Sequence, residues 1–272
     1  MSSDPVARCV AVAPGVTIPY VDRGETTRNA VVLVHGLGDS LRSHEPVLAR
    51  LPDDVRALVP SLRGHGDADR PHDGYSHGDH VRDIATLLDD AGVDRAVIAG
   101  HSSGSQIAQL FAVTSPQRTH GLVLIGAPGP RPDPGGAARM TSEIAALRDP
   151  IDDAWLGELA ESTVAGPVPH PFMEIVLAEA RKVPARVYQA AWPHIRDFNL
   201  SPRLDRIQSP TLIVWGDQDR VPVATRHAQQ QLVDAIPDAR LTIYRGAGHS
   251  PHWEQPERFA ADLASFVRGL PA

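Results

Sequence analysis

Short apolar, β-branched runs that alternate with helix-like segments are the feature that most limits how this 272-residue chain can fold. All of these runs but the last are closed directly by Gly, Pro or His, as is typical of parallel strands buried on both faces. The runs cover residues 31–34, 56–59, 96–99, 122–125, 212–215 and 241–244. Between them, apolar residues recur at helical spacing in segments 79–91, 103–113, 226–236 and 256–270. This alternation predicts an α/β fold with a mostly parallel, twisted sheet flanked by helices.

Two further segments complete the predicted organisation. Residues 7–13 and 18–22, split by Pro14-Gly15, predict an antiparallel hairpin at one edge of the sheet. The alternation breaks between residues 129 and 204, which begin with the predicted connector PGPRPDPGG. Amphipathic pieces follow at 144–147, 154–162, 171–181 and 185–192. We therefore expect a core of residues 1–128 and 205–272, with 129–204 as a helical lid inserted after the sixth strand.

Composition narrows the class of protein. A net charge of −7 argues against a nucleic-acid binder, and no apolar run approaches the roughly 18 residues that span a membrane. The N-terminal stretch MSSDPVARCVAV has no basic-then-apolar pattern, so no secretory signal is visible. Cys9 is the sole cysteine, and the histidines lack H-E-x-x-H spacing. We expect a cytoplasmic monomer or homodimer that acts on a small molecule, without metal or cofactor.

The stretch Gly100-His101-Ser102-Ser103-Gly104 lies between a predicted strand and a predicted helix. A serine in such a sharp strand-to-helix turn is a candidate nucleophile. The turn is so tight that the residues two before and two after the nucleophile meet, so only glycine-sized residues fit there. Ser102 alone among the nearby serines meets this condition. The backbone N–H of Ser103, at the helix start, can then donate to a developing oxyanion.

A serine hydroxyl needs a base, and the base needs a carboxylate to orient it. His249 ends the glycine-rich stretch G-A-G-H after the predicted strand 241–244, where its ring can reach across the sheet. His252 is the rival, but it begins a predicted helix and is less free to reach. Asp217 and Asp219 both follow the strand 212–215, and both remain candidate partners for the histidine.

With these residues the chain resembles the α/β-hydrolase family over nearly its whole length. The resemblance rests on VVLVHGLG from Val31, RGHG from Arg63, GHSSG from Gly100, WGDQDRVP from Trp215, and GAGH from Gly246. It implies Asp219 as the acid, with Asp217 as a turn residue, and the order nucleophile, acid, histidine. It also implies a second oxyanion donor, the N–H of Leu37. The family usually has Asp where this chain has Ser61, and we interpret the loop from Arg63 as structural.

The nucleophile type favours acyl transfer to water. Relatives of this fold that dehalogenate or open epoxides use Asp at the centre of the turn, whereas this chain has Ser102. We therefore expect hydrolysis of a carboxylic ester or lactone through an acyl-enzyme. The candidate substrate contacts are Trp155, Trp192, His194 and Val221.

Three alternatives remain open. The first is a carbon–carbon bond hydrolase of ring-cleavage diketones, which needs a cation for the substrate carboxylate; Arg139, Arg181 or Arg186 would supply it. The second is a cofactor-free haloperoxidase or perhydrolase activity, in which peroxide attacks the acyl-enzyme. The third is a slow-turnover ligand receptor that keeps the same residues.

Overall fold

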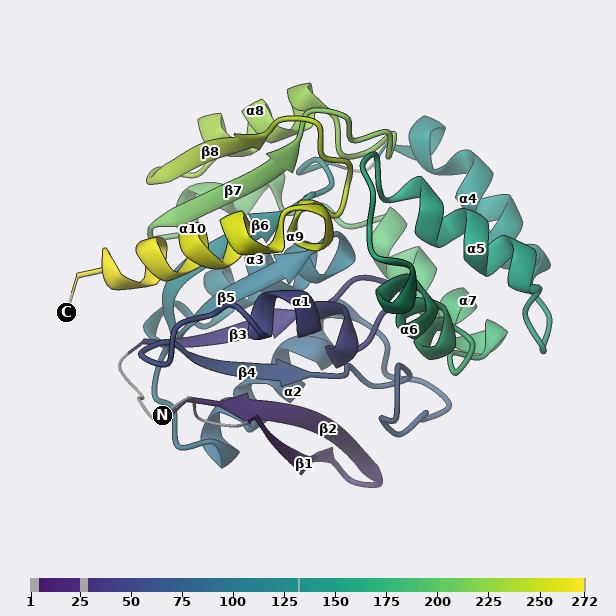
Figure 1. Cartoon of the computed structure of the whole chain (residues 1–272), viewed down its shortest axis with the longest axis horizontal. Helices are drawn as coiled ribbons and strands as arrows, with labels where there is room; N and C mark the ends of the chain where they lie inside the picture. The colour runs from purple at the N-terminus through teal and green to yellow at the C-terminus, as the bar shows by residue number, and fades with distance from the viewer. Residues whose placement is uncertain (1–4, 25–28, 132, 272) are drawn as a thin grey trace.

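The computed structural model describes residues 5–24, 29–131 and 133–271. At its centre is an eight-stranded sheet in the order β1-β2-β4-β3-β5-β6-β7-β8 (Figure 1). The strands are β1 (Val6–Ala13), β2 (Val16–Arg23), β3 (Ala30–Val34), β4 (Arg56–Pro60), β5 (Ala96–His101), β6 (Thr119–Ile125), β7 (Thr211–Gly216) and β8 (Ala239–Tyr244). β2 pairs antiparallel with both β1 and β4, and the other pairs are parallel. The predicted mostly parallel sheet and its edge hairpin are confirmed.

Both faces of the sheet are covered, which explains why its inner strands are apolar runs. Successive residues of β3 point to opposite sides, Val32 and Val34 into one hydrophobic cluster and Val31 and Leu33 into the other. Helices α2 (His77–Asp90), α3 (Ser103–Thr114) and α8 (Arg226–Ala235) pack on the first side. Helices α1 (Glu45–Leu48) and α10 (Pro256–Arg268) cover the second, in front of the sheet in Figure 1.

Short helical turns connect several of these elements. They are η1 (Leu41–His44), η2 (Pro116–Arg118), η3 (Ser201–Arg206) and α9 (Pro251–Glu254). Among them, α9 matters most for the site, because it begins two residues after His249.

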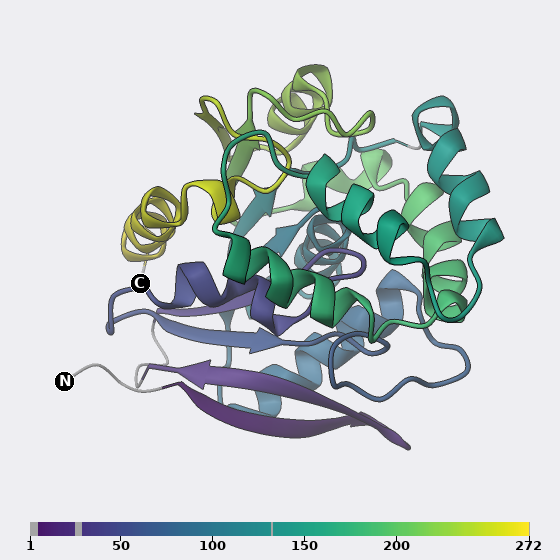
Figure 2. The ribbon, with the colours of Figure 1, turned by 45° about the vertical axis from the view of Figure 1, so that its right-hand side comes forward.

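Helices α4 (Pro134–Ala146), α5 (Asp153–Ser162), α6 (His170–Ala180) and α7 (Ala185–Arg196) form an insertion between β6 and β7. They lie together beyond the carboxyl ends of the parallel strands (Figures 1 and 2). Two predicted boundaries were wrong. Helix α4 begins inside the expected proline-rich connector, because Asp133 caps the helix and a proline, Pro134, is tolerated in its first turn. α7 does not end at residue 192 but continues through Pro193.

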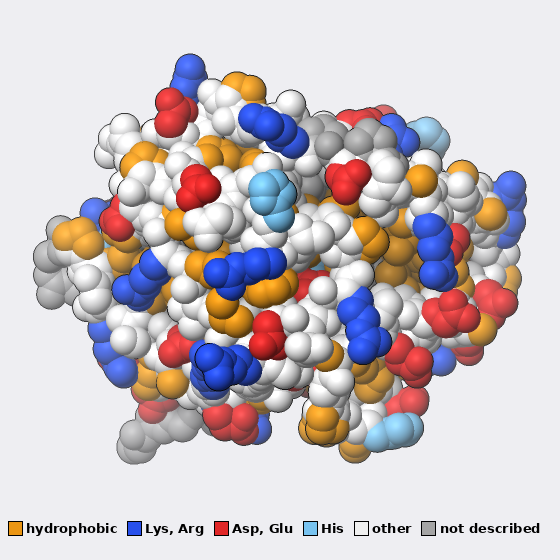
Figure 3. Space-filling model, turned by 90° about the horizontal axis from the view of Figure 1, so that it is seen from above, with side chains coloured by type: hydrophobic (Ala, Val, Ile, Leu, Met, Phe, Trp, Pro, Cys, Tyr) orange, Lys and Arg blue, Asp and Glu red, His pale blue; other side chains and the backbone are white. Residues whose placement is uncertain are grey.

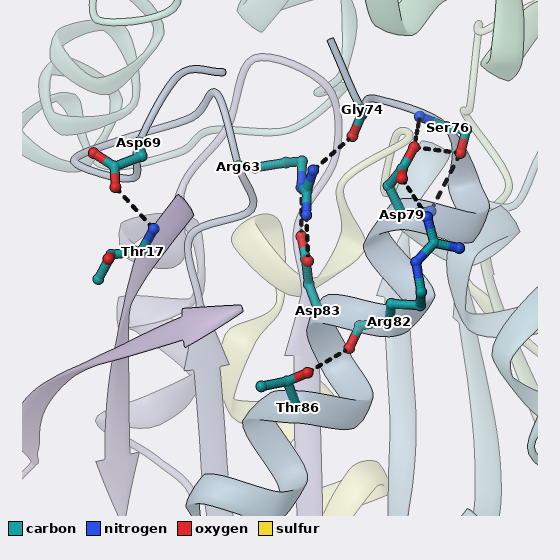
Figure 4. Close-up of polar contacts among 9 residues, drawn as sticks. All are labelled: Thr17, Arg63, Asp69, Gly74, Ser76, Asp79, Arg82, Asp83 and Thr86. Atoms are coloured by element: carbon teal, nitrogen blue, oxygen red, sulfur yellow. Dashed lines mark hydrogen bonds and ion pairs between the residues drawn. The ribbon is translucent and has the colours of Figure 1, made fainter. Parts of the chain in front are cut away.

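The loop from Arg63 is tied to α2 by a buried ion pair (Figure 4). Arg63 donates to both carboxylate oxygens of Asp83, at 2.6 and 2.7 Å, and to the carbonyl oxygen of Gly74 at 3.1 Å. The Asp83 carboxylate raises the pKa of Arg63 above its ordinary value. Ser61, in place of the family's usual Asp, accepts a hydrogen bond from the Leu41 N–H. Helix α2 thus supplies the anionic partner of this loop.

The surface mixes both signs of charge. Figure 3 shows cationic and anionic side chains interspersed over the upper face of the molecule. Among the described residues, Val6 is the one large hydrophobic residue that is exposed. The other large apolar side chains there are at least partly buried. No helix in the described part of the chain is both long and apolar enough to cross a membrane.

Candidate active site

Ser102 occupies a strained turn between β5 and α3. Its φ of 52° and ψ of −121° place it in a region that side-chain-bearing residues rarely adopt, and it is the only non-glycine residue with positive φ in the described part of the chain. A Cβ at Gly100 would overlap the carbonyl group of Gly104, and one at Gly104 would lie 2.5 Å from the carbonyl oxygen of His35. The two glycines therefore meet as the sequence predicts, and the surrounding backbone imposes the turn.

His249 and Asp219 form a buried pair. His249 Nδ1 lies 2.8 Å from Asp219 Oδ2, and the two side chains are 3% and 0% exposed. Asp219 Oδ1 also accepts from the Val221 N–H at 2.9 Å, which fixes the carboxylate. An Nδ1–H donated to the carboxylate leaves Nε2 of His249 as an acceptor. The structure thus brings Asp219 to the histidine.

The rival residues lie elsewhere. Asp217 is exposed and accepts from the Gly246 N–H at 2.7 Å, as a turn residue would. His252 is fully buried on α9 and does not border the cavity that holds Ser102 and His249. The geometry therefore selects His249 and Asp219 from the candidates.

A cavity of about 520 Å³ brings the remaining expected groups together. It is bordered by Ser102, His249, Leu37 and Ser103. The N–H groups of Leu37 and Ser103 make no hydrogen bond within the described residues, and Ser103 is the first residue of α3, where a helix leaves N–H groups unpaired. The Ser102 hydroxyl likewise makes no hydrogen bond to His249 within this part of the chain. The site thus holds two available backbone donors beside a serine and an imidazole acceptor.

Gly126 makes room for the histidine. It follows β6 with a φ of 53°, and a Cβ there would lie 2.5 Å from the carbonyl oxygen of His249 and 3.0 Å from its Nδ1. The imidazole of His249 therefore packs directly against the backbone of Gly126. A side chain at position 126 would displace both the ring and its loop.

Three of the four expected substrate contacts border the cavity, namely Trp155, Trp192 and Val221. The indole N–H of Trp155 donates to Glu143 Oε2 at 3.2 Å, and that of Trp192 to Thr141 Oγ1 at 2.9 Å. Because these N–H groups are already bonded within the insertion, the two indoles offer the cavity mainly apolar surface.

His194 does not belong to the cavity wall, and the expectation that it contacts substrate is not supported. It is exposed, and it lies two residues beyond Trp192 on α7, which puts it about 200° around the helix. Ile195, which we did not single out from the sequence, borders the cavity instead. Its position three residues after Trp192, on the same side of the helix, is the signal that would have identified it.

A group of buried histidines surrounds the His249 loop. His101 Nε2 lies 3.2 Å from the carbonyl oxygen of His249, to which it can donate, and the His101 ring lies 4.5 Å from that of His252 between centroids. Burial lowers the pKa of His101, that of His252 falls well below its usual value, and that of His44 falls to about 3. These rings are therefore neutral at pH 7. No group of three or more His, Cys, Asp or Glu side chains among the described residues is arranged to hold a metal ion.

Known proteins resemble this chain in both sequence and structure. An esterase, RhEst1 from Rhodococcus sp. ECU1013, superposes with a TM-score of 0.83 at 26% identity, covering 100% of both chains. Est816, described as an N-acyl homoserine lactone degrading enzyme, superposes with a TM-score of 0.77 at 30% identity, covering 95% of this chain and 100% of its own.

A sequence relative carries a different activity in its name. The 2-hydroxy-6-oxononadienedioate/2-hydroxy-6-oxononatrienedioate hydrolase of Burkholderia vietnamiensis is 29% identical, over 92% of this chain and 91% of its own. The model of the alpha/beta hydrolase family matches residues 31–262. This match covers most of the chain. The mostly parallel sheet and flanking helices described above agree with it. The chain is a hydrolase that belongs to the alpha/beta hydrolase family.

Proposed function

We propose that the protein hydrolyses carboxylic esters or lactones through an acyl-enzyme formed on Ser102. The observation that carries this proposal is the buried His249–Asp219 pair, which borders the same cavity as a serine held in a strained turn. Leu37 and Ser103, whose backbone N–H groups have no hydrogen-bond partner in the described part of the chain, border that cavity as well. Nucleophile, base, orienting acid and oxyanion donors are the parts that acyl transfer requires.

Each of these groups has a defined task in the proposed reaction. Ser102 Oγ attacks the carbonyl carbon while His249 Nε2 takes the hydroxyl proton. The N–H groups of Leu37 and Ser103 donate to the oxyanion, and Asp219 stabilises the imidazolium. The alcohol leaves with the proton from His249, and a water molecule then releases the acid by the same steps. We expect the Ser102 hydroxyl to form its hydrogen bond to His249 Nε2 when substrate fills the cavity, because such catalytic hydrogen bonds often form fully only in the complex.

The cavity wall favours a substrate with an apolar portion. The insertion supplies Trp155 and Trp192, whose polar atoms are engaged within it, and we propose that helices α4–α7 act as a lid over Ser102. A volume of about 520 Å³ suits a small to medium-sized ester or lactone. The printed description of Est816, at 30% identity, makes lactones the first compounds to assay.

The arginines considered for a diketone acid support cleavage of its carbon–carbon bond less well. Arg181 pairs with Asp153, Arg186 donates to backbone carbonyl groups, and neither borders the cavity. Arg139 does border it, but its guanidinium lies 2.5 Å from Glu143 and is 81% exposed. A substrate carboxylate would have to compete with that glutamate, so ester hydrolysis is the better-supported reaction. The names of relatives such as the Burkholderia hydrolase keep the diketone acids in the assay.

Substituting Ser102 tests the proposal most directly. Ser102→Ala is expected to lower kcat for p-nitrophenyl acetate by about 10⁴–10⁶-fold, because the attacking oxygen is lost. Ser103→Ala is the matched control and is expected to stay active, because its role belongs to the backbone N–H. Circular dichroism would establish that both variants are folded. Loss of activity in the Ser103 variant alone would contradict the assignment.

A covalent probe adds a readout that needs no knowledge of the substrate. A fluorophosphonate is expected to label Ser102, as located by mass spectrometry, and not to label the Ser102→Ala variant. Parallel assays with p-nitrophenyl acetate, a homoserine lactone and a vinylogous diketone acid then rank the reactions. Preferred turnover of the diketone acid would replace the proposal with carbon–carbon bond hydrolysis.

A further inference from the structure

A single carboxylate joins the loop of His249 to the insertion. Glu254 ends α9, five residues after His249. Its Oε2 accepts from the Gly248 N–H at 2.5 Å, while its Oε1 accepts from the N–H groups of Ala165, at 2.7 Å, and Gly166. One side chain thus binds the residue directly before His249 and two residues that connect α5 to α6.

That connection, residues 163–166, lies against the histidine loop on both sides of His249. Thr163 accepts a hydrogen bond from the Ser250 N–H at 2.9 Å. A Cβ at Gly248 would lie only 2.8 Å from the Ala165 nitrogen, so the two backbones touch. In both Figure 1 and Figure 2 the connection runs beside α9. Thr163 and Val164 also border the cavity, so the same short segment faces the substrate and the His249 loop.

Hydrogen bonds from backbone N–H groups to an ionised carboxylate are about twice as strong as neutral ones, and three of them fix this carboxylate closely. The ring of His249 already rests on Gly126 and on Asp219. Glu254 adds a constraint on the loop backbone directly before His249, through the Gly248 N–H. A shift of the 163–166 connection would therefore be passed through Glu254 and Gly248 to the imidazole.

We propose that Glu254 is a positioning residue that holds His249 and the 163–166 connection as one unit. This inference rests on the proposed function, because it concerns the base of that reaction. Glu254 does not border the cavity and is expected to act on turnover through His249 rather than on substrate binding. The insertion would then align the base as well as enclose the substrate.

Two variants of Glu254 test this. A displacement of about 1 Å in an active site can reduce turnover about 10²-fold, so Glu254→Ala is expected to lower kcat by about 10–10²-fold and to leave KM within about 3-fold. Glu254→Gln has one carbonyl oxygen and one NH₂ group. It can therefore accept hydrogen bonds either from Gly248 or from the 163–166 connection, but not from both. Its kcat is expected to lie between those of the wild type and of Glu254→Ala.

Glu257→Ala is the matched control. Glu257 lies in the first turn of the neighbouring helix α10, its side chain is 69% exposed and it pairs with Arg50, so this variant is expected to keep the wild-type kcat and KM. Thermal unfolding of each variant sets an assay temperature at which all are folded. Should Glu254→Ala not fold, the nearly isosteric Glu254→Gln carries the test.

The possible results separate this inference from the proposed function. The order wild type, Glu254→Gln, Glu254→Ala in kcat, and in the rate of Ser102 labelling by a fluorophosphonate, supports the inference. An unchanged kcat in Glu254→Ala, or a change confined to KM, overturns it while ester hydrolysis stands. Persistence of hydrolysis in Ser102→Ala would instead refute the proposed function, and this inference with it.

Discussion

The sheet and the insertion contribute to the site in different ways. The proposed nucleophile, acid and base follow β5, β7 and β8, so three strands of one sheet hold them. Every residue of β5 and β7 is buried, which leaves the strand ends before Ser102 and Asp219 little freedom, whereas most of β8 is only half-buried. The insertion supplies Trp155, Tyr188 and Trp192 to the cavity wall, from helices that form two small apolar clusters separate from the two clusters on the faces of the sheet. The proposed nucleophile and acid are therefore fixed by the core, and the space for substrate is shaped by a more independent unit.

The polar contacts between the two regions are local. Gln106 on α3 donates to the carbonyl oxygen of Ile195, Arg186 on α7 donates to the carbonyl oxygens of Arg70 and Pro71, and Glu254 binds the 163–166 connection. The sheet, in contrast, is held by continuous hydrogen-bonded strand pairs. We therefore expect equivalent substitutions to be far more damaging in the core than in the insertion.

A pair of glycine substitutions gives the largest expected contrast. Gly100→Ala would force a Cβ into the carbonyl group of Gly104, so we expect it to unfold the protein or to destabilise it by more than about 4 kcal/mol. Gly157→Ala lies inside α5 with open space around it and should stabilise the fold by about 0.5–1 kcal/mol. Urea unfolding measures both. Similar effects at the two sites would contradict the contrast.

Ion pairs give the second contrast. Asp83→Asn leaves the guanidinium of Arg63 buried without its anionic partner, and such a loss typically destabilises a protein by about 3–5 kcal/mol. The matched change in the insertion is Asp153→Asn, because Asp153 is 68% exposed where it pairs with Arg181. The midpoint of urea unfolding of that variant is expected to equal that of the wild type. An equal loss in both would show that the insertion depends on its surface charges.

Acid sensitivity gives the smallest of the three contrasts. Burial lowers the pKa of His44 to about 3, so between pH 6.5 and 3 the unfolded chain binds a proton there that the folded chain does not. Stability therefore falls as the pH drops, by about 2 kcal/mol at pH 5 from this residue. His44→Leu should remove that loss, as measured by urea unfolding at pH 7.5 and pH 5.

The control for that measurement lies in the insertion. His170 begins α6 and its side chain is 85% exposed. His170→Gln is therefore expected to unfold with the same dependence on pH as the wild type. If the two variants behaved alike, burial of His44 would not be the cause of the acid sensitivity.

Much of the core could be predicted from the sequence because its local signals agree. Strands buried on both faces are apolar runs, and the glycines at 100 and 104 distinguish Ser102 from its neighbours by steric arguments alone. The choice of Asp219 over Asp217 needed the family resemblance. Both aspartates follow the same strand, and only the fold shows which one faces His249.

The insertion was harder to predict because local signals mislead there. Proline-rich residues indicated a connector, yet Pro134 is compatible with the first turn of α4. The amphipathic segment 185–192 indicated a helix that ends before Pro193, yet α7 continues to Arg196 and carries His194 away from the cavity. The contacts of Glu254 join residues nearly ninety positions apart, and no local pattern indicates them.

The backbone at Ser102 has a consequence for the stability of the fold. Its φ of 52° is readily adopted by glycine, whereas other residues are strained there, by about 1–3 kcal/mol in general. The packing of the core must offset this local cost, so the fold is expected to be less stable with a serine at this position than a relaxed backbone would make it.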